Sequence, residues 1–359
     1  MSNQGISDIT SVLIRVDATK EVALGHLKRC VSLSYKLSEK GVRVSFIVAK
    51  DDFTERFLRT AGFDYTVVRS KTNSDADCVY VLEIAERLNA KVIIIDSYEI
   101  DETYRNKLID NGFFVVSIDD IADKDLPSHI IINGNLNAET LSYTDNGRIA
   151  MCLGIKYLML GPDFGDISNA KAIDDFSNVL ITMGGIDHYD LTSKILLILD
   201  RSDANFDITA IVGPYYENLG SIRSQIDKMS KKVQMIKSPP TLYPYMVKCS
   251  MAFSAGGQTL YELAALGCPA IAITIWENQS GNVSALSKMG AIEGVIYSND
   301  GGFDYVLEKS SLKLIYDKTE RQRLSQIASA IVDGKGAERV SNAIIESYGK
   351  WNVLKKEKK

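Results

Sequence analysis

The chain has 359 residues, of which 45% are apolar and 24% charged, a composition typical of folded globular proteins. At about 150 residues per domain, this length predicts two domains that each bury a full core without help from disulfides or metals. The net charge of −5 argues against a nucleic-acid-binding protein that depends on a broad basic surface.

Strand-like apolar runs alternate with stretches of helical period along the chain, which is the pattern of parallel βαβ units. In the first half, strands are predicted at residues 11–16, 42–48, 65–68, 92–95, 114–118, 129–132 and 157–160. Helices are predicted at residues 26–39, 53–60, 75–88 and 102–110. The first helix is followed by Gly41, and a glycine commonly ends a helix in this way.

A polar stretch at residues 166–177 has no strong period and is interpreted as an interdomain linker. The alternation then restarts, with strands predicted at residues 179–182, 207–212, 233–236, 251–253, 270–274 and 294–297. Helices are predicted at residues 191–199, 221–229, 242–247, 259–266, 282–289 and through 305–348. We therefore expect one doubly wound domain over residues 1–168, a second over 177–335 and a helical tail over 336–359. Two such domains suggest a ligand in the cleft between them.

Charged residues gather where the first predicted strand ends and the first helix begins. Arg15 and Asp17 stand at the carboxyl end of the strand, and Gly25 and His26 open the helix. In an open α/β sheet this edge faces the ligand crevice. Gly25 would let the backbone approach a ligand closely, and a neutral His26 near Asp17 could take a proton from water. The alternative is that His26 only caps the helix.

Two more strands of the first half end in polar residues. One buried strand runs into Asp96 and Tyr98, where Tyr98 could hydrogen-bond a substrate. The next strand runs into Asp119 and Asp120 in the same way. In both places a turn capped by the carboxylate is the alternative, and it stays open.

Paired glycines follow two strands of the second half. Gly184 and Gly185 form a turn that could present free N–H groups to an anion, although a tight connection is the alternative. The sharper signal is the second pair, Gly256 and Gly257, which lies between a predicted strand and a predicted helix. The dipole and free N–H groups of the helix start would stabilise a diphosphate there without a lysine or a metal ion. One turn into that helix, Glu262 could accept two ribose hydroxyls. The predicted nucleotide-binding residues are Ser254, Gly256, Gly257, Gln258, Thr259 and Glu262.

Two amides, Asn278 and Gln279, follow the strand predicted at residues 270–274. Amides donate and accept hydrogen bonds, so they suit the hydroxyl and amide groups of a sugar. Asn278 is an equally good helix N-cap, and this alternative stays open.

In chain order these motifs read I-R-V-D, G-H-L-K-R, I-I-D-S-Y, S-I-D-D, I-N-G-N, M-G-G-I-D, S-A-G-G-Q-T-x-x-E and E-N-Q, over residues 12–300. The ordered set resembles the hydrolases of UDP-2,4-diacetamido-2,4,6-trideoxy-β-L-altropyranose in pseudaminic acid biosynthesis. It also resembles the related spore-coat polysaccharide proteins. The set is specific at the level of this superfamily and less so for the exact substrate.

The resemblance implies a GT-B architecture, in which two Rossmann-like doubly wound domains hold the active site in their interdomain cleft and the second domain binds the nucleotide. It also implies that His26 is catalytic and that Tyr98, Asn278 and Gln279 belong to the site. Together with the residue pattern, this predicts His26, Asp17 and Tyr98 as catalytic residues. The predicted substrate-binding residues are Arg15, Gly25, Arg29, Asp96, Gly184, Gly185, Asn278 and Gln279.

Ser97 is a departure, because the best-known enzymes of pseudaminic acid biosynthesis of this type carry D-H-Y where this chain has D-S-Y. If the histidine shapes the sugar pocket, the substrate is a different deoxyamino sugar. The glycine-rich loop also looks like the nucleotide loop of GT-B glycosyltransferases such as the lipid II N-acetylglucosaminyltransferase. Because of this likeness, a glycosyltransferase remains the alternative function.

The sequence thus predicts a hydrolase that releases UDP from a UDP-linked diacetamido-trideoxy-hexose, with water attacking the anomeric carbon and inversion. An inverting GT-B glycosyltransferase with a UDP-sugar donor and a hydroxyl acceptor is the alternative, and a non-catalytic sensor is a third. No cofactor, metal or nucleic acid is expected. No apolar run reaches the ~18–20 residues of a membrane span, so we expect a cytoplasmic monomer without stable membrane insertion. The five cysteines lack C-x-x-C spacing and are expected to be buried, reduced thiols.

Overall fold

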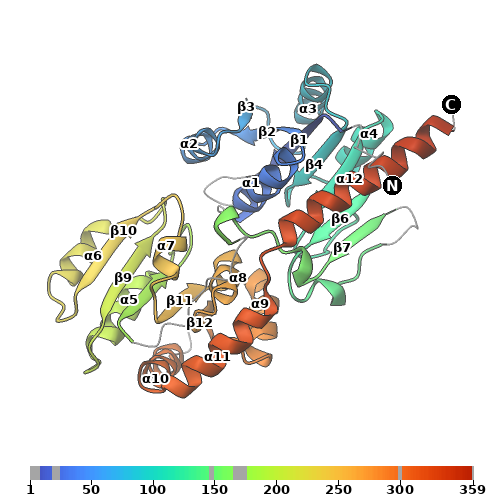
Figure 1. Cartoon of the computed structure of the whole chain (residues 1–359). Coiled ribbons are helices and arrows are strands. Elements are labelled where there is room, and N and C mark those ends of the chain that lie inside the picture. The colour runs from blue at the N-terminus through green and yellow to red at the C-terminus, as the bar shows by residue number, and fades with distance from the viewer. Residues whose placement is uncertain (1–8, 18–24, 145–148, 165–175, 298–300, 358–359) are drawn as a thin grey trace. The chain divides into compact units, whose positions relative to one another are not determined.

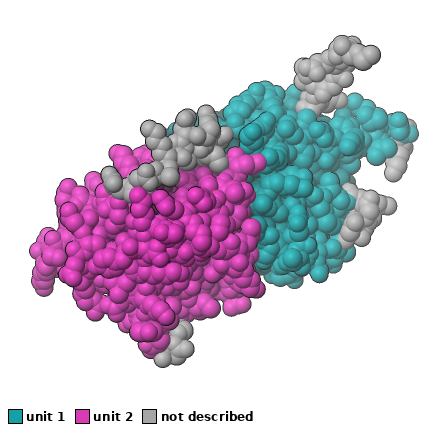
Figure 2. All heavy atoms as spheres, turned by 60° about the horizontal axis from the view of Figure 1, so that its bottom comes forward, with its two compact units in different colours: residues 1–162, 335–359 teal, residues 163–334 magenta. Residues whose placement is uncertain are grey.

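The computed structural model describes residues 9–17, 25–144, 149–164, 176–297 and 301–357 (Figure 1). The chain divides into two compact units, coloured separately in Figure 2. Unit 1 comprises residues 1–162 and 335–359, and unit 2 comprises residues 163–334. Most of the predicted linker, residues 166–177, lies outside the described residues.

Unit 1 is built on a seven-stranded parallel sheet in the order β3-β2-β1-β4-β5-β6-β7. Its strands are β1 (Ser11–Val16), β2 (Arg43–Ala49), β3 (Asp64–Val68), β4 (Val92–Asp96), β5 (Phe114–Ile118), β6 (Ile130–Asn133) and β7 (Ala150–Leu153). Its helices are α1 (Gly25–Ser38), α2 (Asp52–Ala61), α3 (Asp75–Arg87), α4 (Glu102–Asp110) and α12 (Gly336–Glu357), with short 3₁₀ turns η1 (Ala138–Thr140) and η2 (Ile155–Tyr157). The order reverses between β1 and β4, so the carboxyl ends of these two strands form the topological switch point where α/β sheets bind ligands.

Unit 2 repeats the arrangement with a six-stranded parallel sheet in the order β10-β9-β8-β11-β12-β13, whose switch point lies between β8 and β11. Its strands are β8 (Asn178–Thr182), β9 (Asp207–Val212), β10 (Val233–Lys237), β11 (Met251–Ala255), β12 (Ala270–Thr274) and β13 (Glu293–Ile296). Its helices are α5 (Leu191–Asp200), α6 (Leu219–Ile226), α7 (Tyr243–Met246), α8 (Gln258–Ala265), α9 (Glu277–Lys288), α10 (Phe303–Tyr316) and α11 (Lys318–Ile331), and the 3₁₀ turn η3 (Pro162–Phe164) precedes them. The prediction of two doubly wound α/β folds is confirmed.

One predicted strand, at residues 157–160, is wrong. The seventh strand of unit 1 is β7, seven residues earlier, and Gly154 at φ 90° ends it before the turn η2. The apolar residues that suggested a strand, including Leu158 and Leu160, are buried without joining the sheet. The backbone of Leu158 lies against the start of α12, where a side chain on Gly336 would overlap it.

The long helix α12 completes the core of unit 1, although the sequence suggested only a separate helical tail. Val340, Ile344 and Tyr348 on one face of α12 are buried in the same apolar cluster as Leu27 of α1 and Val16 of β1. Figure 1 shows α12 lying across unit 1 near α1 and β6. Helix α12 therefore supports α1, whose first turn carries the predicted catalytic histidine.

All five cysteines are buried and free, as the sequence predicted. No helix among the residues that the structure describes is both long enough and apolar enough to cross a membrane.

The stability of unit 1 is expected to depend on pH through His129. Its Nδ1 accepts a hydrogen bond from the Val115 N–H (3.0 Å), and its ring packs against Phe114 and Trp351. Burial lowers the pKa of His129 from 6.5 to about 4. The unfolded chain therefore binds this proton more readily, and the free energy of unfolding should fall by up to about 3 kcal/mol as the pH drops from 6.5 to 4.

Urea unfolding followed through the emission of Trp351, in a Trp276→Phe background, measures this dependence. The matched control is His129→Gln, because glutamine keeps an acceptor for the Val115 N–H and does not titrate. An equally steep loss of stability on acidification in this variant would assign the effect to other groups.

Candidate functional site

The predicted site residues of unit 1 meet at the switch point of its sheet. Strands β1 and β4 run side by side with Val16 opposite Asp96, and the Asp17 N–H donates to the Asp96 carbonyl (3.1 Å). Strand β5 lies on the other side of β4, so Asp120, two residues beyond β5, reaches the same edge. This placement of polar residues at the ends of neighbouring parallel strands is the one that the sequence predicted.

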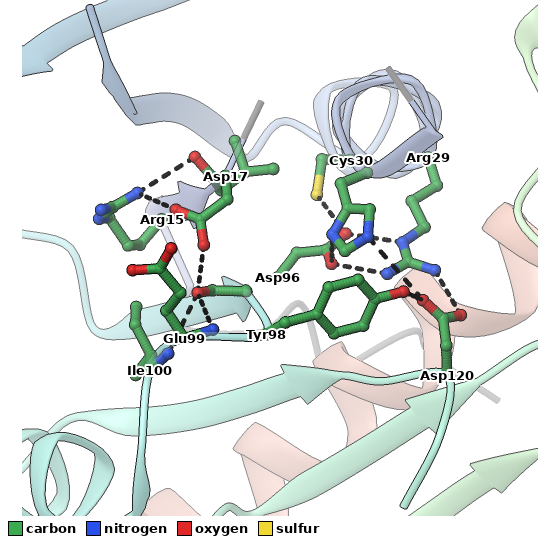
Figure 3. Close-up of polar contacts among 12 residues, drawn as sticks. Arg15, Asp17, Arg29, Cys30, Asp96, Tyr98, Glu99, Ile100 and Asp120 are labelled. Atoms are coloured by element: carbon green, nitrogen blue, oxygen red, sulfur yellow. Dashed lines mark hydrogen bonds and ion pairs between the residues drawn. The ribbon is translucent and has the colours of Figure 1, made fainter. Parts of the chain in front are cut away.

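Arg29, in the second turn of α1, joins the two carboxylates. Its Nε donates to Asp96 Oδ2 (2.7 Å) and its Nη2 to Asp96 Oδ1 (2.6 Å), which makes a bidentate pair. Its Nη1 donates to Asp120 Oδ1 (2.7 Å). Figure 3 shows Arg29 in this bridging position. The guanidinium therefore fixes the distance between the two acids.

His26 lies against both acids from the first turn of α1. Its Nδ1 is 2.6 Å from Asp96 Oδ1, although the ring N–H does not point along this line, and its Nε2 is 4.0 Å from Asp120 Oδ2. The edge of the His26 ring contacts Tyr98, with the ring centroids 4.7 Å apart at 80°. The side chain is only 7% exposed, so access of solvent to the imidazole is narrow.

The surroundings of this cluster fix the protonation states of its two carboxylates and of Tyr98. Burial works against ionised carboxylates here, but the Arg29 guanidinium outweighs it and lowers the pKa of both Asp96 and Asp120. Burial together with the charge of Asp120 raises the pKa of Tyr98 far above its usual range, and the Tyr98 hydroxyl donates to Asp120 Oδ2 (2.7 Å). At neutral pH the cluster thus holds two carboxylates, one guanidinium and a protonated tyrosine around His26.

Asp17, which we expected beside His26, has different partners. It accepts hydrogen bonds from Arg15 Nη1 (3.0 Å) and from the Ser97 hydroxyl. Successive residues of a strand point to opposite faces of a sheet, so Arg15 and Asp17 face α3 and α4, whereas Asp96 faces α1. The carboxylate in contact with His26 is therefore Asp96, and Figure 3 shows Arg15 and Asp17 well away from Arg29 and Asp120.

Ser97, the residue after Asp96, has its contacts on the opposite face of the sheet, as Asp17 does. Its hydroxyl accepts from the backbone N–H groups of Glu99 (3.1 Å) and Ile100 (3.2 Å) and donates to Asp17. Ser97 thus holds the turn after β4 and is tied to the Asp17 side of the sheet. The departure at this position lies away from the contact between His26 and Asp96.

Sequence reasoning left Asp120 undecided and did not select Asn135. Asn135 Nδ2 donates to Asp120 Oδ1 (2.9 Å), so the I-N-G-N motif after β6 supports the acid that Arg29 and Tyr98 also contact. The signal was the repeated pattern of a buried strand that ends in polar residues, at β4, β5 and β6. No group of three or more His, Cys, Asp or Glu residues that could hold a metal ion occurs in the described part of the chain.

Unit 2 places its paired glycines at its own switch point. Gly184 has φ 83° in the turn after β8, and a side chain on Gly213, after β9, would overlap the carbonyl oxygens of Gly184 and Gly185. This close packing, which the sequence did not reveal, fixes the turn. Asp187 holds the next helix, since its carboxylate accepts from the Leu191 N–H (2.9 Å) and the Thr192 N–H (2.8 Å).

The predicted nucleotide loop joins β11 to α8. Gly256 packs against α9, because a Cβ there would lie 2.5 Å from Val283 Cγ2 and 3.0 Å from Gln279 Cβ. Gly257 is the N-cap of α8 and has open space where a Cβ would stand. Glu262 is buried one turn into α8. The remaining predicted loop residues are Ser254, whose hydroxyl donates to the Ala255 carbonyl, and Gln258 and Thr259, which are half-buried in the first turn of α8.

The amide pair falls in the first turn of α9. Gln279 Oε1 accepts from the backbone N–H groups of Ile275 (3.0 Å) and Trp276 (3.4 Å), so this amide holds the start of the helix. The side chain of Asn278 lies outside the described part of the structure. Their contacts with a substrate stay predictions.

Comparisons with known proteins agree with the fold. No family model matches the chain. The uncharacterized protein MJ1062 of Methanocaldococcus jannaschii is 22% identical over 73% of this chain and 55% of its own. The spore coat polysaccharide biosynthesis protein SpsG of Bacillus subtilis is 24% identical over 62% of this chain and 66% of its own. The Helicobacter pylori pseudaminic acid cytidylyltransferase and UDP-2,4-diacetamido-2,4,6-trideoxy-beta-L-altropyranose hydrolase is 26% identical over 75% of this chain and 45% of its own.

The chain therefore spans about half to two thirds of the length of these relatives. Among solved structures, Acinetobacter baumannii MurG superposes with a TM-score of 0.69 at 12% identity, over 94% of this chain and 99% of that one. The UDP-GlcNAc 2-epimerase from Neisseria meningitidis bound to UDP-GlcNAc gives 0.64 at 13% identity, over 94% and 100% of the two chains. The chain thus has the two-domain α/β GT-B fold, and its sequence is distantly similar to those of the spore-coat polysaccharide protein and the Helicobacter enzyme.

Proposed function

We propose that the chain is a nucleotide-sugar hydrolase that acts on a UDP-linked diacetamido-trideoxy-hexose. Water attacks the anomeric carbon with inversion, the bond from that carbon to the diphosphate oxygen breaks, and UDP leaves. The observation that carries this proposal is the contact between Asp96 and His26 at the switch point of unit 1. The Asp96 carboxylate is within hydrogen-bonding distance of Nδ1, and a rotation of the ring that aligns the Nδ1–H with it leaves Nε2 to take a proton, which is the arrangement of a general base.

In unit 1, His26 takes the proton of the attacking water, and Asp96 orients the imidazole through Nδ1. Arg29 keeps Asp96 and Asp120 ionised and in place. Tyr98 donates its hydroxyl proton to Asp120, so its oxygen is left to accept a hydrogen bond from the sugar. Arg15 and Asp17 hold the turn that carries Tyr98, through Ser97, and we assign them a positioning role.

In unit 2, the N–H groups at the start of α8 and its dipole stabilise the charge that develops on the leaving diphosphate. Glu262 accepts the ribose hydroxyls, and the turn at Gly184 and Gly185 contacts the substrate. Because the helix end supplies this stabilisation, we propose that turnover is independent of metal ions. Turnover that stops in EDTA and returns with magnesium would contradict this part of the proposal.

The name of the Helicobacter relative includes a UDP-sugar hydrolase, which supports hydrolysis over transfer. The structural neighbours include glycosyltransferases as well as epimerases, so transfer to a hydroxyl acceptor is the second candidate. The two reactions differ in one observable: a hydrolase releases UDP without an acceptor.

The deciding experiment follows a UDP-linked diacetamido-trideoxy sugar by ³¹P and ¹H NMR with no acceptor present. Release of UDP and free sugar, with the inverted anomer formed first, is the expected result. Intact substrate that protects the protein against thermal unfolding would point to a transferase that lacks its acceptor.

Two adjacent glycines allow a matched test of the nucleotide loop. Gly257→Ala should fold normally, because a Cβ there meets nothing within 4 Å, and should weaken UDP binding if the diphosphate lies close to this backbone. Gly256→Ala should instead lower thermal stability, since its Cβ would lie 2.5 Å from Val283. Calorimetric titration with UDP and a melting curve measure the two effects. Wild-type affinity in a stable Gly257→Ala protein would place the diphosphate elsewhere.

A further inference from the structure

An exposed tryptophan stands at the carboxyl edge of the unit 2 sheet. Trp276 lies two residues after the end of β12 and directly precedes α9, and it is 48% exposed. Large aromatic side chains carry much apolar area, and one left in solvent at a ligand-binding edge of a parallel sheet is suited to stack on a ligand. The proposed reaction gives this residue no role.

Trp276 is the outer end of a chain of aromatic contacts. Its ring centroid lies 5.9 Å from those of His188, at 90°, and Tyr189. The Tyr189 ring packs against that of Tyr297, with the centroids 4.5 Å apart and the planes tilted by 33°, and Tyr297 meets the buried Phe303 edge-on at 5.0 Å. The ring is thus supported by a series of side chains that runs from the surface into the core of unit 2.

Topology places this cluster beside the nucleotide loop. The sheet order runs β8-β11-β12, so β11 lies between the two strands that the aromatic residues follow. His188 and Tyr189 come after β8 and Trp276 comes after β12. Their contact therefore brackets the end of β11, where the predicted nucleotide loop begins. Gly256 of that loop also packs on Gln279, in the first turn of the helix that Trp276 precedes.

Both supports of the cluster are fixed by hydrogen bonds to the backbone, which are buried at Asp187 and partly buried or exposed at Gln279. Gln279 Oε1 holds the backbone N–H groups of Ile275 and Trp276, and Asp187, next to His188, holds the first turn of α5. A platform held in place before the ligand arrives loses little conformational freedom on binding.

We propose that Trp276, braced by His188 and Tyr189, is the stacking platform for the sugar ring of the nucleotide sugar and sets its specificity. This inference rests on the proposed function, in which α8 receives the diphosphate and Glu262 receives the ribose. Because Glu262 holds the nucleoside along α8, the ring nearest to the start of α9 is the sugar on the other side of the diphosphate. An indole accepts the C–H face of a sugar that has lost hydroxyls better than it accepts a fully hydroxylated face.

The chain offers a clean probe, because Trp276 and Trp351 are its two tryptophans. Trp351 packs against Phe114 and His129 in unit 1, so Trp351→Phe leaves Trp276 as the single tryptophan of a full-length protein, which can be excited selectively. In this background the UDP-linked diacetamido-trideoxy sugar should change the emission at saturation, and UDP should change it less. Equal changes with both ligands would assign the ring to the base and overturn the proposal.

Affinity gives the second readout. Trp276→Ala should weaken binding of the UDP-sugar by about 10- to 100-fold and leave UDP affinity nearly unchanged, with KM raised more than kcat is lowered. Trp276→Phe should recover part of the loss. Because Trp276 is exposed, both variants should melt as the wild type does.

The failures of the two proposals are distinguishable. A wild-type protein that binds neither UDP nor the UDP-sugar overturns the proposed function and this inference with it. Wild-type KM and affinity in Trp276→Ala, with UDP release intact, overturn the inference alone.

Discussion

Replacing His26 by alanine is expected to remove most of the turnover, by about 10²- to 10⁴-fold in kcat, which is the usual contribution of a positioned acid–base group. The imidazole contacts Asp96 and lies within 4.0 Å of Asp120, and both carboxylates are already bound by Arg29, so we expect neither of them to replace it fully as a base. UDP binding should change little, because the predicted nucleotide loop belongs to unit 2. UDP release by NMR and a calorimetric titration with UDP measure the two quantities.

The control for this variant is His26→Gln, which keeps a side-chain amide near Asp96 but cannot accept and release a proton at neutral pH. If His26 acts by proton transfer, both variants are equally slow. Recovery of turnover in His26→Gln would show that His26 only fills space and orients its neighbours, and full turnover in His26→Ala would end the proposed mechanism.

The strands of both sheets could be predicted because each is marked by a pattern within a short stretch of sequence. Strand β4 is an unbroken apolar run, buried on both faces, and a glycine or polar turn bounds each strand of this kind. The failure at residues 157–160 has a non-local cause. The segment that follows β7 is buried because α12, far along the chain, packs against it at Gly336, and no window of sequence around Leu158 contains that partner.

The sequence predicted most residues of the candidate site in unit 1, though not Asn135, and it did not predict which of them contact one another. Parallel strands that end together bring Arg15, Asp17 and Asp96 to one edge, and this follows from the fold class alone. Which acid meets His26 depends on the register of β1 and β4. Val16 lies opposite Asp96, so Asp17 points to the other face and Asp96 points to α1. A shift of one residue would have reversed the two roles, and no feature of the sequence specified that shift.

Because Asp96 contacts both His26 and Arg29, the variant Asp96→Asn is expected to lose both stability and turnover. Asparagine keeps the volume but not the charge, so Arg29, whose side chain is 14% exposed, loses its bidentate partner and keeps only Asp120. Breaking a buried pair in this way costs about 3–5 kcal/mol. We expect this loss of unfolding free energy together with a fall in kcat similar in size to that of His26→Ala. Chemical unfolding and UDP release measure the two effects.

Asp17→Asn is the matched control, because Asp17 is also buried and also pairs with an arginine, the fully buried Arg15. It should cost comparable stability but less kcat than Asp96→Asn, since Asp17 faces away from α1. Equal losses of kcat would mean that general destabilisation, and not the orientation of His26, explains both variants.

The double variant His26→Ala with Asp96→Asn then tests how Asp96 acts. If the carboxylate works only through the imidazole, its removal has nothing left to disturb once His26 is gone, and the double variant should turn over no more slowly than His26→Ala. If Asp96 instead contacts the substrate or the attacking water itself, the two losses multiply. The non-additive outcome is the expected one, because Asp96 lies behind His26, bound on both oxygens by Arg29.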